Sequence, residues 1–186
     1  EPISCRLMFD LLKTAGADRI MSVDLHAAQS QGFFDGPVDH LIAMPVLVDY
    51  IRDRFANQLD NVAVVSPDAG RIRVAEQWAQ RLGGGPLAFV HKTRDITRPN
   101  QAVANRVVGD VEGKDCVLVD DLIDTAGTIA GACSVLKDAG AKSVTVVATH
   151  GVLSGPAIER LKGSGAREVV LTDTVPIPEE KRWDGL

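Results

Sequence analysis

The fold of this chain is decided by one stretch, CVLVDDLIDTAGTIAGA, at residues 116–132. It opens with a short apolar run, continues through two adjacent acids and a turn containing a glycine, and turns helix-forming at about Thr128. Such an apolar run is typical of a strand buried on both faces of a parallel sheet. The stretch therefore predicts a strand that ends at Asp120 and Asp121, a tight loop and then a helix.

The same alternation of short apolar runs and helix-period stretches extends over the whole chain. Alternation of this kind indicates βαβ units, and so predicts an α/β fold: a parallel sheet with helices on both faces. The predicted strands are residues 20–23, 62–65, 87–90, 117–119, 144–147 and 169–171. The predicted helices are residues 4–15, 45–58, 73–82, 128–139 and 156–162.

The chain also repeats itself: LLKTAGA at residues 11–17 reappears as VLKDAGA at residues 135–141, with a shorter echo at 161–166. A helix that stops at a glycine and feeds a strand explains each copy locally. A second interpretation is that two similar domains are present. With Gly-Pro and Met-Pro breaks between residues 36 and 45, we predict two parts. These are residues 1–40, the last part of one domain, and residues 41–186, a second domain.

Composition excludes some classes of protein. A net charge of −5 argues against a general nucleic-acid partner, because such binding needs clustered Lys and Arg. No apolar run approaches the roughly 20 residues that span a bilayer, and the start at Glu1 has no charged-then-apolar leader, so no membrane is expected. Cys5, Cys116 and Cys133 fit neither a disulfide framework nor a zinc pattern, and we expect them to be buried apolar side chains. We therefore expect a soluble cytoplasmic protein.

The loop between the predicted strand and helix is suited to an anion, because main-chain N–H groups converge at a helix N-terminus. Asp120 and Asp121 can accept hydrogen bonds from vicinal hydroxyls, as a ribose offers. An alternative is that Thr128 merely caps the helix, but this leaves the two carboxylates and the glycine unexplained. The predicted phosphate-binding residues are Asp124, Thr125, Ala126, Gly127 and Thr128.

This motif resembles the PRPP-binding motif of the phosphoribosyltransferase fold. Three further stretches resemble ribose-phosphate diphosphokinases: SVDLHAAQSQGFF at residues 22–34, VSPDAG at 65–70 and HKTR at 91–94. The resemblance runs the whole length of the chain, and is most like the bacterial class I enzymes. It implies transfer of the diphosphoryl group of ATP to the C1 hydroxyl of ribose 5-phosphate, which gives PRPP and AMP for nucleotide biosynthesis.

The resemblance also implies roles for particular residues. His26 and Asp68 match the family's Mg²⁺ contacts, although by themselves they also fit a hydrogen-bonded histidine and a turn residue. Lys92 and Arg94 match a catalytic pair on a flexible loop, here the basic stretch 92–100, which by itself fits a solvated loop. Arg94 is also expected to bind ribose 5-phosphate, together with Asp120, Asp121 and the loop from Asp124 to Thr128.

The chain departs from the family pattern at a few positions. Ala28 stands where the family usually has an acid, Thr93 where it often has Arg, and Ala126 where Gly or another small residue is usual. The part of the ATP site that the family supplies early in its N-terminal domain is expected to be missing, as is a C-terminal helical segment. We therefore expect the 186-residue chain to bind ribose 5-phosphate weakly and to be catalytically incompetent alone.

The resemblance further implies a homo-oligomer, commonly a hexamer built from dimers, with phosphate and ADP as effectors. Two alternatives remain open. A nucleobase phosphoribosyltransferase would share the 120–128 motif, but it needs a base-recognition hood for which the sequence offers no candidate. A non-catalytic regulatory subunit of a diphosphokinase complex is the other.

Overall fold

The computed structural model describes residues 2–93 and 104–186. The chain divides into two compact units, residues 1–45 and residues 46–186, and each is described by itself. The division falls next to Pro45, at the end of the Gly-Pro and Met-Pro stretch. The assignment of the first unit to the end of a preceding, similar domain stays a prediction.

The first unit is a helix followed by two parallel strands. Helix α1 (Pro2–Thr14) leads into β1 (Ile20–Val23), a 3-10 turn η1 (Ala28–Phe33) and β2 (Val38–Leu41). The strands pair in parallel, from Ile20 opposite Val38 to Val23 opposite Leu41. Strand β2 was not predicted, because its sequence VDHL has little apolar content and follows a Gly-Pro pair. It forms where β1 offers it a hydrogen-bonding edge.

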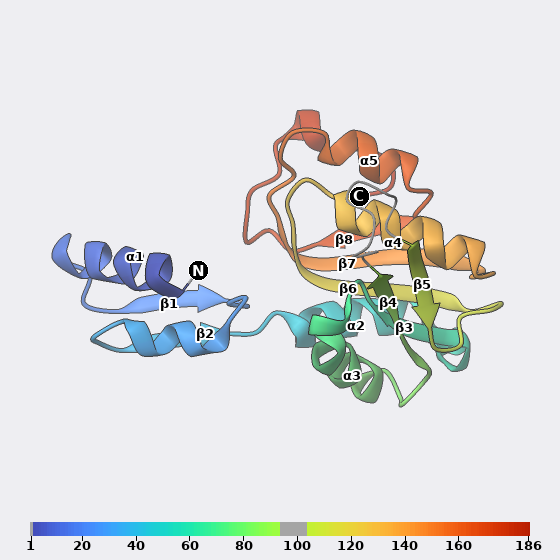
Figure 1. Cartoon of the computed structure of the whole chain (residues 1–186), viewed down its shortest axis with the longest axis horizontal. Helices are drawn as coiled ribbons and strands as arrows, with labels where there is room; N and C mark the ends of the chain where they lie inside the picture. Colours follow the sequence, from blue (N-terminus) through green and yellow to red (C-terminus); the bar gives the residue numbers. More distant parts are fainter. Residues whose placement is uncertain (1, 94–103) are drawn as a thin grey trace. The chain divides into compact units, whose positions relative to one another are not determined.

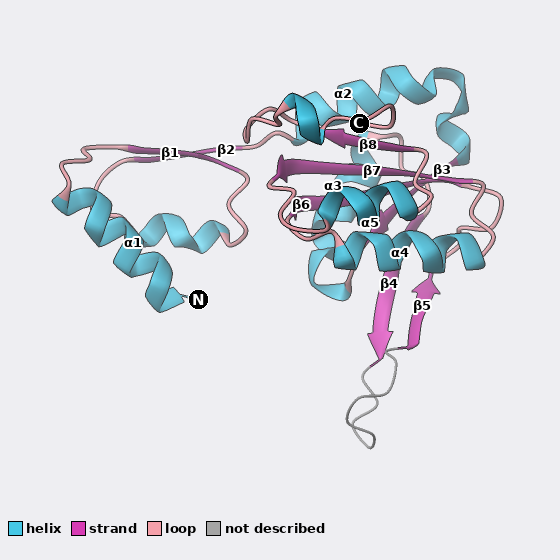
Figure 2. Cartoon of the chain, turned by 90° about the horizontal axis from the view of Figure 1, so that it is seen from above, coloured by secondary structure: helices cyan, strands magenta, loops and turns pink. Residues whose placement is uncertain are grey.

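Within its described residues, the second unit is built on a six-stranded sheet of order β5-β4-β3-β6-β7-β8. All neighbouring strands are parallel except β4 and β5, which pair antiparallel (Figure 2). The predicted parallel α/β fold is confirmed, and β5 is an addition to it. The strands are β3 (Val62–Ser66), β4 (Leu87–Thr93), β5 (Ala104–Val108), β6 (Asp115–Ile123), β7 (Ser143–Gly151) and β8 (Glu168–Leu171). The helices are α2 (Met44–Phe55), α3 (Ile72–Arg81), α4 (Gly127–Asp138) and α5 (Ala157–Gly163), with 3-10 turns η2 (Ala56–Asn61), η3 (Ala69–Arg71) and η4 (Glu179–Lys181).

Helices cover both faces of this sheet. In Figure 1, α4 and α5 lie over one face, and α2 and α3 lie over the other. Side chains on a strand alternate between faces, so Cys116 and Leu118 enter the cluster that contains Leu136 of α4, whereas Val117 and Val119 point to the opposite face. Burial on both faces explains why the strands read as continuous apolar runs.

Helix α4 and strand β7 are joined by the repeated sequence, and its glycine ends the helix as predicted. Gly140 has φ +84°, its N–H bonds the carbonyl of Lys137, and Ala141 N–H bonds the carbonyl of Leu136. In the first copy, Gly16 has φ +100° and the N–H groups of residues 16 and 17 bond the carbonyls of residues 13 and 12. The two copies therefore share one helix C-cap, in which a left-handed residue lets the chain leave the helix.

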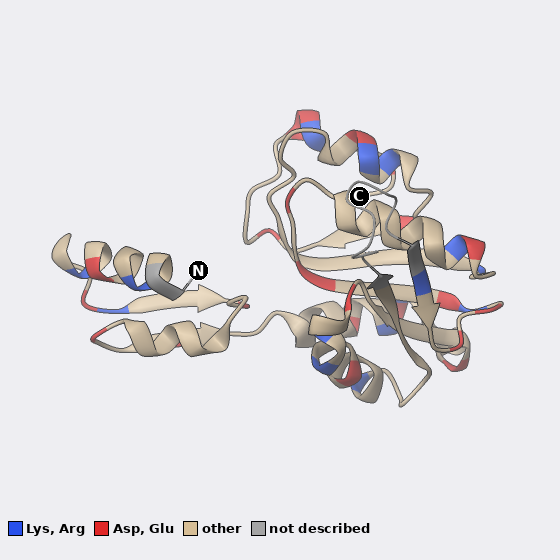
Figure 3. Ribbon diagram, in the orientation of Figure 1, with Lys and Arg blue, Asp and Glu red and all other residues tan. Residues whose placement is uncertain are grey.

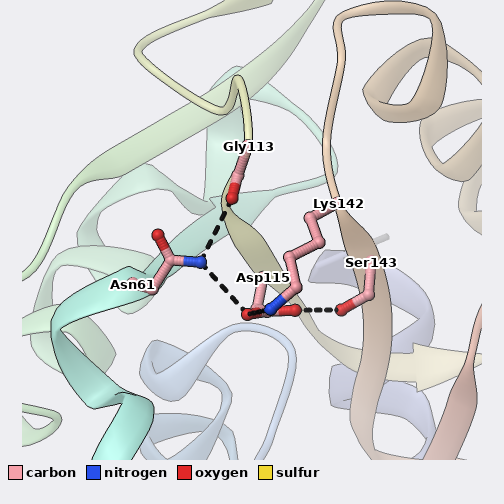
Figure 4. A network of polar contacts seen from close by, with 5 residues as sticks. All are labelled: Asn61, Gly113, Asp115, Lys142 and Ser143. Carbon is pink, nitrogen blue, oxygen red and sulfur yellow. Dashed lines mark hydrogen bonds and ion pairs between the residues drawn. The ribbon is translucent and has the colours of Figure 1, made fainter.

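A buried carboxylate joins three elements at the start of β6. Asp115 is 1% exposed and accepts hydrogen bonds from Lys142 Nζ at 2.8 Å, Ser143 Oγ at 2.7 Å and Asn61 Nδ2 at 3.1 Å (Figure 4). Burial by itself raises the pKa of this carboxyl, but these hydrogen bonds and the Lys142 charge hold it below its ordinary value. The network ties the end of η2, just before β3, to the starts of β6 and β7.

The described cysteines form no disulfide. Cys116 and Cys133 are buried, as predicted, and burial raises the pKa of their thiols to about 12 and about 11. Cys5 is only half-buried.

Positively and negatively charged residues are interspersed along the outer helices of the second unit (Figure 3). Among the described residues, no helix combines the length and the apolar character that crossing a membrane requires.

Candidate functional site

The sheet of the second unit changes direction between β3 and β6. From β3 the chain moves through β4 to β5 on one side, and then β6 is added on the other side of β3. Open α/β sheets bind ligands at such a switch point, outside the carboxyl ends of the strands. Asp68 follows β3, and the 124–128 loop follows β6, so both lie where the two strands end.

Strand β6 is longer than the sequence predicted. It runs through Ile123, so Asp120 and Asp121 lie within the strand rather than after its end, and this part of the prediction is wrong. The reason is that β7 continues to pair with this segment, with Asp120 opposite Ala148. On the other side the pairing with β3 stops at Leu118. Asp120 and Asp121 therefore lie in a part of β6 that is still paired with β7 but is no longer paired with β3.

The two carboxylates interact with each other. The Asp121 N–H donates to Asp120 Oδ1 at 2.9 Å, and Asp121 forms an ion pair with Arg71. Burial raises the pKa of the Asp120 carboxyl to about 7, and the neighbouring Asp121 adds to the rise while the Arg71 charge opposes it. The surroundings of Asp120 therefore favour the protonated form of its carboxyl more than water does, and the Arg71 charge limits this effect.

The 124–128 loop passes through one left-handed residue. Ala126 has φ +59° and ψ +11°, is 4% exposed and precedes α4, whose first residue is Gly127. Around it Asp124, Thr125, Gly127 and Thr128 are exposed. The N-cap position is Ala126, which makes no side-chain cap, so the alternative in which Thr128 serves only as the cap is not supported. Thr128 instead lies in the first turn of the helix.

The loop carbonyls are tied to neighbouring structure. The Ile123 carbonyl accepts from the N–H groups of residues 152 and 153, and the Asp124 carbonyl accepts from Ser154 N–H at 2.9 Å. The Thr125 carbonyl accepts from Arg160 Nη1 of α5 at 2.9 Å. Within the part of the chain that the structure describes, the N–H groups of Thr125, Ala126 and Gly127 donate no hydrogen bond. In this exposed turn the carbonyls accept hydrogen bonds from neighbouring residues, whereas the N–H groups of residues 125–127 have no acceptor within the described part of the chain. Such N–H groups at a helix N-terminus are suited to binding an anion.

Arg71 and Arg160 were not predicted. Arg71 lies three residues after Asp68, so its place beside the predicted site could have been noticed from adjacency alone. Nothing in the sequence around Arg160 indicates its contact, because α5 reaches the 124–128 loop only in the folded chain.

The two predicted metal contacts belong to different units. Asp68 follows β3 in the second unit, where its Oδ1 accepts the Gly70 N–H at 2.8 Å. His26 is an exposed residue after β1 in the first unit. Its turn is held to β2, because Leu25 N–H donates to His40 Nε2 at 2.9 Å and Asp24 N–H to the Leu41 carbonyl at 2.9 Å. Within residues 2–93 and 104–186, no group of three or more His, Cys, Asp or Glu side chains suited to a metal ion occurs.

The predicted catalytic pair falls mostly outside the described structure. Lys92 lies in β4, where its backbone pairs with that of Asn105, but its side chain is not described. Arg94 and most of the predicted basic loop lie outside the described residues.

The fold and this site define the chain first as a phosphoribosyltransferase-like α/β protein. A crystal structure of orotate phosphoribosyltransferase from Aeropyrum pernix matches with a TM-score of 0.53 and 27% identity, covering 68% of each chain. The family model of the phosphoribosyl synthetase-associated domain matches residues 96–183.

Within this class, the chain is similar over its whole length to ribose-phosphate pyrophosphokinases. It is 94% identical to that of Bifidobacterium longum over 186 residues, which cover 55% of the relative. The crystal structure of phosphoribosylpyrophosphate synthetase from Mycobacterium smegmatis matches all of this chain and 58% of its own, with a TM-score of 0.90 and 60% identity. These matches confirm the family resemblance predicted from the sequence, and the chain spans about half the length of the relatives.

Proposed function

We propose that the second unit binds ribose 5-phosphate, and that the whole protein transfers the diphosphoryl group of ATP to it. The binding proposal rests on the exposed 124–128 loop, in which the N–H groups of residues 125–127 have no hydrogen-bond acceptor among the described residues. This loop directly follows the strand that carries Asp120 and Asp121, at the switch point of the sheet. The loop suits the terminal phosphate, and the carboxylates suit the hydroxyls of the pentose.

In the proposed reaction the C1 hydroxyl oxygen of ribose 5-phosphate attacks the β-phosphorus of ATP. The bond from that phosphorus to the oxygen shared with the α-phosphate breaks, AMP leaves, and the hydroxyl proton is released. Lys92 and Arg94 are assigned to stabilise the negative charge on the transferred and leaving phosphates, as positively charged groups do in phosphoryl transfer. Arg94 is also assigned to contact ribose 5-phosphate.

Mg²⁺ is the expected cofactor, and it would neutralise part of the phosphate charge of ATP. The carboxylate of Asp68 fits this ion, because Mg²⁺ prefers oxygen and the Gly70 N–H bonds only one carboxylate oxygen, Oδ1. A histidine nitrogen is an unusual Mg²⁺ ligand, so the role of His26 as a metal contact rests on the family resemblance alone.

A direct binding measurement tests the ribose 5-phosphate site. We expect the 186-residue chain to bind ribose 5-phosphate more tightly than ribose or inorganic phosphate, in NMR titrations that follow the amides of residues 124–128. Thr128→Ala should weaken binding by about tenfold, through loss of a hydrogen bond to a charged group. Ser134→Ala, an exposed change farther along α4, is the matched control and should leave the affinity unchanged.

The activity is tested separately, in a full-length protein that contains this sequence. Replacing Lys92 by Ala should reduce PRPP formation by orders of magnitude, whereas a non-catalytic regulatory subunit would show no activity to lose. AMP release from ATP distinguishes the proposed reaction from that of a nucleobase phosphoribosyltransferase, which releases pyrophosphate from PRPP.

The cellular setting is part of the same proposal. We expect a cytoplasmic homo-oligomer, a hexamer built from dimers, with phosphate and ADP as effectors. The free, buried Cys116 and Cys133 are consistent with a reducing compartment. Analytical ultracentrifugation of the full-length protein, with and without ADP, tests the assembly.

A further inference from the structure

Arg71 connects the two strand ends that flank the candidate site. Its guanidinium forms an ion pair with Asp121, and the two side chains are only 17% and 11% exposed. The residues are 50 positions apart in sequence and meet because β3 and β6 are neighbours in the sheet. Removing charged groups from water is costly, so a pair this sheltered is held in place by the structure around it.

The turn that carries Arg71 is itself fixed. Ser66 Oγ donates to the Asp68 carbonyl at 2.6 Å, and Asp68 Oδ1 accepts the Gly70 N–H at 2.8 Å. These bonds define the entry into η3, whose last residue is Arg71. The backbone that leads to Arg71 is therefore ordered by hydrogen bonds within the turn.

The face of the sheet explains why Asp121 is the partner. Asp121 shares its strand face with Val117 and Val119, which is the face that α2 and α3 cover, and η3 leads directly into α3. Asp120 is linked to Asp121 by the hydrogen bond from the Asp121 N–H to Asp120 Oδ1 at 2.9 Å. The charged groups that act on Asp120 are Asp121 and Arg71.

We propose that Arg71 is a positioning residue for the pentose: it fixes the Asp121 carboxylate, and through it the neighbouring Asp120, as acceptors for the ribose hydroxyls. This assignment rests on the proposed ribose 5-phosphate site. Without the Arg71 charge, two adjacent carboxylates would share a proton more readily, and a protonated carboxyl is a poorer acceptor for a hydroxyl donor. Arg71 itself is not assigned a contact with the ligand.

The test compares Arg71→Met, Arg71→Lys and the control Arg73→Met, an exposed arginine in the first turn of α3. Ribose 5-phosphate is titrated into each variant of the 186-residue chain, and binding is followed by NMR at several pH values from about 6 to about 8.5. We expect Arg71→Met to weaken binding by roughly tenfold or more near pH 6.5, with recovery as the pH rises and the carboxylates ionise. Arg73→Met should bind as the unmodified chain does.

A merely structural ion pair would give a different result. Arg71→Met would then lower thermal stability, but it would leave the affinity and its pH dependence unchanged, and that outcome would overturn the proposal. Arg71→Lys keeps the charge without the planar fork of the guanidinium, so it separates charge from geometry. If Arg71→Met does not fold, Arg71→Lys decides: wild-type affinity at every pH would contradict the need for a fixed guanidinium.

A ligand-free measurement separates this proposal from the proposed function. The carboxyl ¹³C signals of Asp120 and Asp121 report their protonation directly, and Arg71→Met should move the midpoint of the pair to higher pH. If the unmodified chain does not bind ribose 5-phosphate, the proposed function fails whatever this titration shows. If it binds but the midpoint does not move, the assignment of Arg71 alone fails.

Discussion

Ala126 holds a backbone conformation that L-residues other than glycine seldom adopt. With φ +59°, it carries the strain of a left-handed residue, but its buried methyl group packs in the core beside α4. Glycine would relieve strain of about 1 kcal/mol and lose methyl burial of about 0.8 kcal/mol. The two effects nearly cancel at this position.

We therefore expect Ala126→Gly to change the free energy of unfolding by less than about 0.5 kcal/mol, and Ala126→Val to lower it by about 2 kcal/mol or more. A β-branched residue is both strained at positive φ and too large for a site that is 4% exposed. Urea denaturation of the two variants checks this, and equal stability of the valine variant would contradict the left-handed conformation.

Asp115 makes part of the stability depend on pH. Its pKa is lowered in the folded protein, so its contribution is fully present above the unfolded pKa of about 3.9 and is lost as the pH falls through the lower folded value. We expect Asp115→Asn to lower the free energy of unfolding at pH 7 by roughly 1.5–3 kcal/mol, the value of hydrogen bonds to a charged group. The difference from the unmodified chain should shrink in acid.

Urea denaturation at neutral and acid pH measures this difference. Asp60→Asn, at an exposed position in η2, is the control and should change stability by less than about 0.5 kcal/mol. A destabilisation by Asp115→Asn that is the same at every pH would show that the lowered pKa has no part in it.

At the scale of elements, the helix–turn–strand unit occurs in both units with the same hydrogen bonds. Gly16 and Gly140 have φ of +100° and +84°, so an alanine at either position is strained. Gly163, at the end of α5, has no positive φ, and a methyl group added there would meet no neighbour within 4 Å. We expect Gly16→Ala and Gly140→Ala each to cost about 1 kcal/mol. Gly163→Ala should be neutral or slightly stabilising. The free energy of unfolding of the three variants is measured by chemical denaturation. A loss at residues 16 and 140 but not at 163 would show that the left-handed helix cap, and not alanine itself, is the cause.

The length of β6 shows what the residue pattern misses at this scale. The apolar run stops at Val119, so the sequence predicted a strand end at the acids, yet the strand continues through Ile123. A polar residue can stay in a strand when a neighbouring strand pairs with its backbone, and β7 does so here. The identities of the candidate site residues were therefore available from the motif, whereas their backbone geometry was not.

At the scale of the whole molecule, the two units differ in how much apolar surface they bury. In the first unit Leu7, Met8, Leu11 and Met21 are between 53% and 70% exposed, whereas the second unit contains the large core cluster around its sheet. A unit of about 45 residues with little buried apolar surface is only marginally stable. We expect β1 to exchange its backbone amide hydrogens much faster than β6.

Hydrogen-exchange mass spectrometry on the intact chain measures this difference. Open, weakly packed segments exchange at free energies well below that of global unfolding. The buried centre of β6 gives the reference for the most protected state. Equal protection of β1 and β6 would contradict the prediction and would indicate that the chain unfolds as one cooperative whole.

The sequence by itself determined the parallel α/β class, the positions of most strands and helices, and the motif of acids, threonines and glycine at residues 120–128. It could do so because buried parallel strands, helix caps and anion-binding turns depend on residues that are close together in the chain. Only the tertiary structure decided that β5 runs antiparallel, that β6 extends through its acids, and that Arg71 pairs with Asp121. Each of these depends on which strands become neighbours, and that choice brings together residues that no local pattern connects.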